Sequence, residues 1–451
     1  MAELQHWYSK PKRKPLILRG ARQVGKSTLA REFARSAGLR LWEVNLEKHA
    51  SLDGVFGKLD PSQVLREISL ALNTPNVGKE PGILFLDEIQ ESPKALACLR
   101  YFYEEMPDLA VMAAGSLLEF TLSNAEFSMP VGRVEYFWLG PLTFDEYLAG
   151  QGETEAGDFL GQWELEGTYS ASVHQRLLGR LREFLMVGGM PEAVQAFIDG
   201  GEFLSAVEVH HSILGTYRDD FSKYARGAEL EKLRRVFDVL PRVVGRKVQY
   251  RQFHPDWKAQ DIRHCLELLE RAGIAFPVLH TSGQGLPLGA GEDPTVWKAF
   301  FLDVGLAGTA NGNSAQSLAD FLGGGFLNEG AVAEQFVAQE IASAQPRSQR
   351  ARLHYWLREG KSHNAELDFL VPAGTAVLPV EVKSGTSGSL RSLHQFMLAH
   401  RGGRAVRLDL NEPSVQEINT EVMNAEGKQQ VSYRLANLPL YMAGRLSSLM
   451  L

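Results

Sequence analysis

The chain reads Gly20-Ala21-Arg22-Gln23-Val24-Gly25-Lys26-Ser27 near its start, and this octet decides the fold of the first domain. It fits the pattern G-x-x-x-x-G-K-[ST], with an apolar run at residues 15–18 before it and a helical pattern at residues 28–34 after it. The two glycines let the backbone curl so that successive N–H groups point at phosphate oxygens, and the following helix adds the positive end of its dipole. The octet and Thr28 therefore predict a strand, a phosphate-binding loop and a helix that begins near Lys26.

A second apolar run, at residues 83–86, ends in the carboxylates Asp87 and Glu88. Such a continuous run is typical of a strand buried on both faces of a parallel sheet. In a nucleoside triphosphate site, Lys26 would neutralise the β- and γ-phosphates, and Ser27 and Asp87 would hold Mg²⁺. Glu88 would polarise the attacking water. The alternative interpretation is an acidic strand end that faces solvent.

Composition sets limits on the class of protein. The chain has 451 residues, enough for about two to four domains, with 44% hydrophobic and 22% charged residues, as in ordinary globular proteins. Its net charge of −7 excludes a generic polycation, so any contact with nucleic acid requires a local patch. The cysteines, Cys98 and Cys265, lie far apart, which argues against a disulfide framework or zinc site and fits a reducing cytoplasm. We expect no signal peptide and no membrane span.

Residues 1–150 alternate short apolar strands with helical patterns, which favours a parallel α/β sheet. Further strands are expected at residues 39–44, 84–86 and 109–114, and phosphates would lie at the carboxyl ends of these strands. Ser116 follows the last of them, where a hydroxyl could sense the γ-phosphate. The alternative for Ser116 is an ordinary turn that ends a strand.

Arg133 follows a short segment, residues 129–132, that reads Met-Pro-Val-Gly. Its guanidinium is suited to the charge of a phosphoryl-transfer transition state, in its own subunit or in that of a neighbour. The alternative is an arginine on the surface without a role in chemistry.

The middle of the chain is predicted to be mostly helical. Residues 151–227 form one block, and residues 228–312 contain two helices, at 230–244 and 261–272, followed by a hairpin made by 275–279 and 298–302. Helices followed by a hairpin suggest a winged-helix-like segment. Because its acidic and basic residues are balanced, we interpret this segment as a structural or protein-contact module. Residues 314–325, rich in glycine, are a plausible linker.

The last segment, residues 313–451, contains a second group of chemical residues. Residues 366–371 and 377–383 are expected to form a hairpin. Glu381 and Lys383 would project from the same face of its second strand, because side chains alternate with a period of two, and Asp368 could meet them from the neighbouring strand.

A preceding helix, at residues 329–341, contains Glu334, which could add a third carboxylate. Two or three carboxylates with an ammonium make a Mg²⁺ site with a charge partner for water or phosphate. This is the D…E-x-K arrangement of restriction-endonuclease-like nucleases. The alternative is a surface ladder of salt bridges across a hairpin.

Taken together, these motifs resemble the prokaryotic AAA-type ATPases that carry a C-terminal domain of unknown function with a restriction-endonuclease-like, PD-(D/E)XK, fold. The resemblance spans nearly the whole chain. Several of the motifs have no strong mechanism of their own, so the resemblance is specific because all of them occur together. The motifs are residues 15–27, 86–90, 114–116, 132–133, 139–148, 188–192, 302–306, 366–369, 381–384 and 438–441.

The resemblance implies a P-loop ATPase core at 1–150, a helical lid at 151–227, a winged-helix-like segment at 228–312 and a nuclease-like α/β domain at 313–451. It implies ATP and Mg²⁺ at Gly20, Gly25, Lys26, Ser27, Asp87 and Glu88. Onto the nuclease pattern it maps Glu334, Asp368, Glu381 and Lys383.

Two functions follow from these predictions. In the first, ATP binding and hydrolysis regulate a C-terminal domain that binds and cleaves DNA or RNA, with Asp368 and Glu381 holding a second Mg²⁺ and Lys383 acting at the attacked phosphodiester. In the second, the protein is a nucleotide-dependent signalling switch, and its C-terminal domain is a catalytically silent platform for a protein or DNA. A protein partner or a homo-oligomer is compatible with both. The net acidity favours the switch, whereas the intact Asp368, Glu381 and Lys383 set favours the nuclease.

Overall fold

A computed structural model of the chain describes residues 1–122, 132–165, 167–312, 330–359, 364–400, 403–424 and 427–449. The chain forms two compact units. The first comprises Met1–Gly140 with two short later segments, Arg271–Gly273 and Pro346–Arg350, and the second comprises the remainder. The linker expected at residues 314–325 lies outside the described residues.

The first unit is built on a parallel sheet of five strands in the order β2-β3-β4-β1-β5. Four of the strands were predicted from the sequence and are confirmed; β5, only four residues long, was not predicted. The strands are β1 Leu16–Arg19, β2 Arg40–Asn45, β3 Gly82–Asp87, β4 Ala110–Ala114 and β5 Glu135–Trp138.

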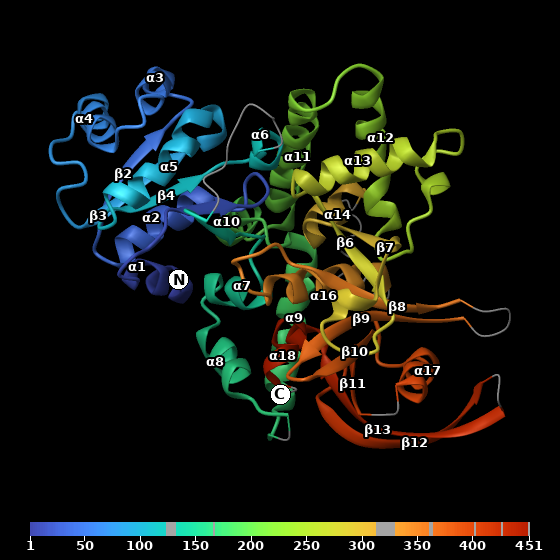
Figure 1. Ribbon diagram of the computed structural model, residues 1–451. Helices are drawn as coiled ribbons and strands as arrows, with labels where there is room; N and C mark the ends of the chain where they lie inside the picture. The colour runs from blue at the N-terminus through green and yellow to red at the C-terminus, as the bar shows by residue number, and fades with distance from the viewer. Residues whose placement is uncertain are drawn as a thin grey trace. The chain divides into compact units, whose positions relative to one another are not determined.

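Helices cover both faces of this sheet (Figure 1). Along β3, Phe85 packs with α1 (Ala2–Ser9) and α2 (Lys26–Ser36), whereas Leu84 and Leu86 pack with the opposite layer. Successive strand side chains point to opposite faces, so a strand covered on both sides must be apolar throughout. The opposite layer contains α3 Asp53–Phe56, α4 Pro61–Ala71 and α5 Pro93–Glu105, and a short helix, α6 Leu118–Leu122, follows β4.

The second unit begins with helices. The helices expected at residues 230–244 and 261–272 are confirmed as α12 and α13. The helices are α7 Phe144–Gly150, α8 Thr154–Gln162, α9 Ala171–Val187, α10 Pro191–Gly200, α11 Phe203–Asp220, α12 Ala228–Val243, α13 Ala259–Arg271, α14 Val304–Ala310, α16 Gly330–Ser343, α17 Arg391–Ala399 and α18 Leu446–Leu449. Among the described residues, no helix has the length and apolar character needed to span a membrane.

A mixed sheet of eight strands completes the second unit, in the order β12-β13-β11-β10-β9-β8-β6-β7. The hairpin predicted at residues 275–279 and 298–302 is present as β6 and β7. Because β6 also pairs in parallel with β8, this hairpin forms one edge of the C-terminal sheet. The boundaries of the lid, the winged-helix-like segment and the last domain stay predictions. The strands are β6 Ala275–Thr281, β7 Glu292–Phe301, β8 Leu353–Arg358, β9 Ala365–Ala373, β10 Ala376–Val382, β11 Arg404–Asp409, β12 Ser414–Asn424 and β13 Gly427–Pro439.

Candidate functional site

The phosphate-binding loop joins β1 to α2, and its glycines are required by the backbone. Gly20 has a φ of +138°, and a Cβ atom there would lie 2.1 Å from the carbonyl oxygen of Leu139. Gly25, with a φ of 90°, lies in the left-handed region and caps the N-terminus of α2. Both conformations favour glycine. The loop therefore has the curled backbone, ending at a helix N-terminus, that the octet predicted.

Lys26 is the first residue of α2, and only 9% of it is exposed. Its Nζ donates hydrogen bonds to the carbonyl oxygens of Gly20, at 3.1 Å, and Ala21, at 2.6 Å. Burial lowers the pKa of Lys26 to about 8, although the charges of Glu88 and Asp87 oppose the shift. The ammonium is thus buried inside the loop, where a phosphate would be its natural counter-ion.

Ser27 and Asp87 meet at the carboxyl ends of the strands. The Ser27 hydroxyl donates to both carboxylate oxygens of Asp87, at 3.1 and 3.0 Å. Burial raises the pKa of Asp87, while the hydrogen bond from Ser27 opposes the shift. These oxygen donors suit Mg²⁺, which proteins bind through one or two such groups and the substrate phosphates.

Glu88 follows directly and adopts a left-handed conformation, with φ 53° and ψ 47°. Its Oε2 accepts a hydrogen bond of 2.5 Å from the side-chain amide of Gln90. A non-glycine residue in this region of backbone space is uncommon, and such residues cluster at functional sites. The left-handed turn places Glu88 beyond the end of β3, next to Asp87, with its carboxylate oriented by Gln90.

Ser116 lies just after β4 and is 4% exposed. Among the described residues, its hydroxyl has no hydrogen-bond partner, and the same holds for Oε1 of Gln90. A Cβ atom on the preceding residue, Gly115, would lie 2.4 Å from that Gln90 oxygen. The segment after β4 therefore lies against Gln90, the residue that orients Glu88.

The structure does not bring Arg133 to the phosphate-binding loop of its own chain. Its side chain is 43% exposed and forms an ion pair of 2.9 Å with Glu104, near the C-terminus of α5. Arg133 precedes β5, whose first residue pairs with Leu16 at the start of β1. The loop follows the other end of β1, so Arg133 lies at the amino edge of the sheet, opposite the nucleotide site.

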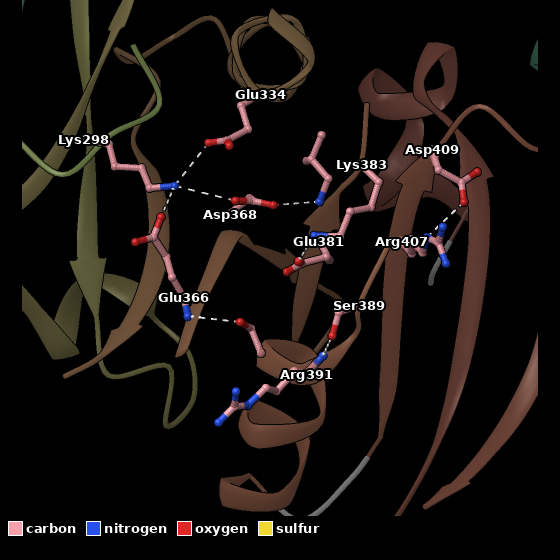
Figure 2. Close-up of polar contacts among 12 residues, drawn as sticks. Lys298, Glu334, Glu366, Asp368, Glu381, Lys383, Ser389, Arg391, Arg407 and Asp409 are labelled. Atoms are coloured by element: carbon pink, nitrogen blue, oxygen red, sulfur yellow. Dashed lines mark hydrogen bonds and ion pairs between the residues drawn. The ribbon is translucent and has the colours of Figure 1, made fainter. Parts of the chain in front are cut away.

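The second candidate site is an acidic cluster in the C-terminal sheet, and its centre is a lysine that the sequence analysis did not select (Figure 2). The side chain of Lys298, on β7, is 1% exposed. Its Nζ lies 2.6 Å from Oε1 of Glu366, 3.2 Å from Oε2 of Glu334 and 3.7 Å from Oδ1 of Asp368. The missed signal is a single charged residue within an apolar stretch, residues 296–302.

The remaining predicted residues lie beside this centre. Asp368 accepts, through Oδ2, a hydrogen bond of 2.8 Å from the backbone N–H of Val382. Lys383 donates to Oε1 of Glu381, whose Oε2 is buried and has no partner among the described residues. Burial, reinforced by the charge of Asp368, raises the pKa of Glu381 to about 7. Glu334 and Asp368 thus lie at Lys298, and Glu381 pairs with Lys383.

These residues do not fit the second Mg²⁺ predicted at Glu334, Asp368 and Glu381. Among the described residues, no group of three acidic, histidine or cysteine side chains is arranged to hold a metal ion. The oxygens of Glu334, Glu366 and Asp368 converge on the Lys298 ammonium, and Glu381 faces Lys383. Burial lowers the pKa of Lys298, but the three carboxylates raise it more, so the pKa lies above its ordinary value. The raised pKa favours the charged ammonium at this position.

A buried junction accounts for motifs that had no mechanism in the sequence analysis. Asp303 is fully buried and accepts hydrogen bonds from the backbone N–H groups of Gly189, at 2.6 Å, and Leu306, at 2.9 Å. The carbonyl oxygen of Gly189 accepts one from Leu142, at 2.7 Å. Gly188 has a φ of +68°, and a Cβ there would lie 2.2 Å from Oδ1 of Asp303. Hydrogen bonds therefore join three motifs, at residues 139–148, 188–192 and 302–306.

Helix α16 joins the same junction. Oε1 of Gln339 accepts a hydrogen bond of 3.1 Å from the N–H of Val304, and Oε1 of Glu340 accepts one of 3.0 Å from the N–H of Phe144. Burial raises the pKa of Glu340 to about 8. Since Glu334 lies on this helix too, α16 connects the junction to the acidic cluster.

Comparison with known proteins identifies three regions. Residues 12–148 match an AAA domain, and residues 178–317 and 329–427 match two domains of unknown function, DUF8612 and DUF4143. No curated protein matches the chain. The AAA match supports a P-loop ATPase that binds nucleotide, in agreement with the parallel sheet and the loop. A restriction-endonuclease-like fold is not shown for the C-terminal region.

Two solved structures are similar in part. A replication initiator DnaA bound to AMPPCP and single-stranded DNA is 11% identical, and the match covers 60% of this chain and 85% of that chain with a TM-score of 0.28. A DNA replication initiation factor is 13% identical over the same shares, with a TM-score of 0.23. Scores this low carry no argument about this chain.

Proposed function

We propose that the chain is an ATP-hydrolysing, nucleotide-dependent switch whose C-terminal domain binds a macromolecular partner without metal-dependent cleavage. The observation that carries the ATPase is the meeting of Ser27 and Asp87, at 3.0 to 3.1 Å, beside a buried lysine of the phosphate-binding loop. The observation that carries the silent C-terminal domain is the position of Lys298 among the carboxylates.

In this proposal each residue of the nucleotide site has a separate task. The loop N–H groups and Lys26 bind the phosphates, and Ser27 and Asp87 hold Mg²⁺, which neutralises phosphate charge when bound. Glu88 orients the attacking water and accepts its proton. Ser116 senses the γ-phosphate through its buried hydroxyl, which has no partner among the described residues. Arg133 would act only on a neighbouring subunit of a homo-oligomer, because it lies at the far edge of its own sheet.

The route of regulation follows the chain. Gly20 of the phosphate-binding loop packs against Leu139, and the N–H of Leu139 donates to Arg19, at 2.8 Å. Three residues later, Leu142 donates to Gly189 in the junction that α16 joins. A change of backbone at the loop on phosphate binding would therefore be transmitted through residues 139–144 to α16.

Cleavage of nucleic acid is the second candidate for the C-terminal domain. It is favoured by the convergence of Asp368, Glu381 and Lys383 on neighbouring strands. The misfit with Mg²⁺ favours the silent platform instead, with DNA, RNA or a protein as the bound partner. Incubation of the full chain with single- and double-stranded DNA and RNA, with Mg²⁺ and with or without ATP, separates the two candidates. Cleavage that is lost in Glu381→Gln would establish the nuclease and reject the platform.

Hydrogen exchange tests the switch. We expect ATP to change amide exchange in α16 and in residues 186–190 of the Glu88→Gln protein, which would bind ATP without hydrolysing it. Lys26→Ala is the control, since it should bind ATP only weakly and show a much smaller change at the same ATP concentration. Unchanged exchange in α16 at saturating ATP would reject the regulation and leave the ATPase in place.

A further inference from the structure

Lys298 lies in a part of the sheet where a lysine is unusual. Its neighbours Ala299, Phe300 and Phe301 are buried, with exposures of 1% or less, and its own side chain is exposed by only 1%. The ring of Tyr355 lies 5.2 Å from its Nζ. A buried ammonium is costly unless it is paired and hydrogen-bonded, so its partners must be fixed parts of the structure.

Lys298 and its partners come from three different elements. Glu334 extends from α16, Glu366 and Asp368 lie on β9, and Lys298 comes from β7 (Figure 2). Lys298 therefore links the hairpin edge of the sheet to a helix and to a central strand. Removing one partner of a buried ion pair leaves an uncompensated charge, and this destabilises the folded protein.

Both carboxylate oxygens of Asp368 are already engaged. Asp368 uses one oxygen for Lys298 and the other for the N–H of Val382. A Mg²⁺ ion needs near-octahedral oxygen ligands at about 2.0–2.1 Å, and the point where Glu334, Glu366 and Asp368 converge is occupied by the Lys298 ammonium. The Lys298 side chain is almost completely enclosed, with 1% exposure.

We propose that the Lys298 ammonium is the permanent cation of this acidic cluster and replaces the divalent metal ion that the carboxylates would otherwise bind. The cluster then holds the sheet, the hairpin and α16 together without metal. The proposal does not rest on ATP hydrolysis, because it concerns only residues of the C-terminal sheet and α16. If the proposal holds, removal of the Lys298 side chain should allow the carboxylates to bind a metal ion.

The test is Mn²⁺ binding by the full chain, measured by electron paramagnetic resonance in an Asp87→Asn background that removes the nucleotide-site metal ligand. We expect no saturable Mn²⁺ binding with Lys298 present. Lys298→Met should gain one Mn²⁺ site, and adding Asp368→Asn should abolish it. Lys247→Met is the matched control: Lys247 faces Lys298 across a β-bridge but pairs with the exposed Glu359, so its removal should create no site.

Two outcomes would overturn the proposal. The first is one Mn²⁺ bound with Lys298 present and lost in Asp368→Asn or Glu381→Gln, a result that does not depend on whether Lys298→Met folds. The second is a folded Lys298→Met protein that binds no Mn²⁺. If Lys298→Met is unfolded without metal, the proposal requires that Mn²⁺ restore its thermal transition, and failure of that rescue rejects it.

Discussion

The Ser27 hydroxyl donates to both carboxylate oxygens of Asp87, although the two residues are 60 positions apart in the chain. The pair forms because β1 and β3 are parallel strands separated only by β4, so their carboxyl ends lie at one edge of the sheet. This contact brings together the two side chains that we propose as Mg²⁺ ligands of the ATPase.

Ser27→Ala removes one of the two proposed Mg²⁺ ligands. We expect ATP hydrolysis to fall on the order of 100-fold, since metal charge stabilisation is worth several kcal/mol in such reactions. ATP affinity measured without Mg²⁺ should change little. The control is Ser36→Ala, at the other end of the same helix, where the hydroxyl donates to the carbonyl oxygen of Phe33. Equal losses in the two variants would show that the effect is structural.

Lys26 should make ATP binding depend on pH. Its pKa of about 8 in the free protein would rise when phosphate charge is bound, so binding takes up a proton above pH 8. Affinity should therefore be constant below pH 7 and weaken by up to about tenfold per pH unit above pH 8. Titration calorimetry from pH 6 to 9.5 measures this slope. Lys26→Met should bind weakly at every pH without the slope; a slope that persists would assign the proton to another group.

Gly188→Ala should disrupt the junction. A Cβ there would collide with Asp303 and threaten its hydrogen bonds to Gly189 and Leu306. We expect a loss of about 3 kcal/mol in the free energy of unfolding of the second unit, measured with urea. Gly227→Ala is the control, because Gly227 also has a positive φ, 52°, but nothing lies within 4 Å of its added Cβ. Similar losses would mean that backbone strain alone accounts for the effect.

Glu340 should make stability fall as pH rises. Its folded pKa, about 8, lies above the usual value of 4.5, because of burial and then the nearby Asp145 and Glu146, with Arg445 opposing. The folded state holds the proton more tightly, so this stabilisation is complete below about pH 4.5 and is lost as pH rises to about 8. Glu340→Gln keeps an oxygen for the N–H of Phe144 and should flatten the decline in melting temperature between pH 5 and 8.5. The exposed Glu208→Gln should leave it unchanged; an unaltered decline in Glu340→Gln would contradict the assignment.

Much of the nucleotide site could be predicted because its information is local. The octet combines a strand, a turn and a helix in consecutive residues, and the apolar run before Asp87 identifies a buried strand. The short β5 was missed because four residues, of which only Phe137 is buried, carry too weak a pattern. The left-handed conformation of Glu88 and the role of Gln90 depend on packing after β3, which no spacing rule describes.

The acidic cluster shows where prediction from sequence fails. Its carboxylates were found by the alternation of side chains along strands, but their partner lies 36 residues before Glu334, on a strand assigned to another segment. The same holds for the junction, where Gly189 and Asp303 are 114 residues apart. Motifs can be seen in one sequence, but the register that brings them together is a property of the folded sheet and its helices.

The central claim is tested most directly by measuring ATP binding and hydrolysis of the unaltered chain beside Glu88→Gln and Lys26→Ala. The account predicts Mg²⁺-dependent hydrolysis by the unaltered chain. It predicts bound ATP with hydrolysis reduced at least about 100-fold in Glu88→Gln, and only weak ATP binding in Lys26→Ala. Hydrolysis by Glu88→Gln at the unaltered rate, or tight ATP binding by Lys26→Ala, would contradict it.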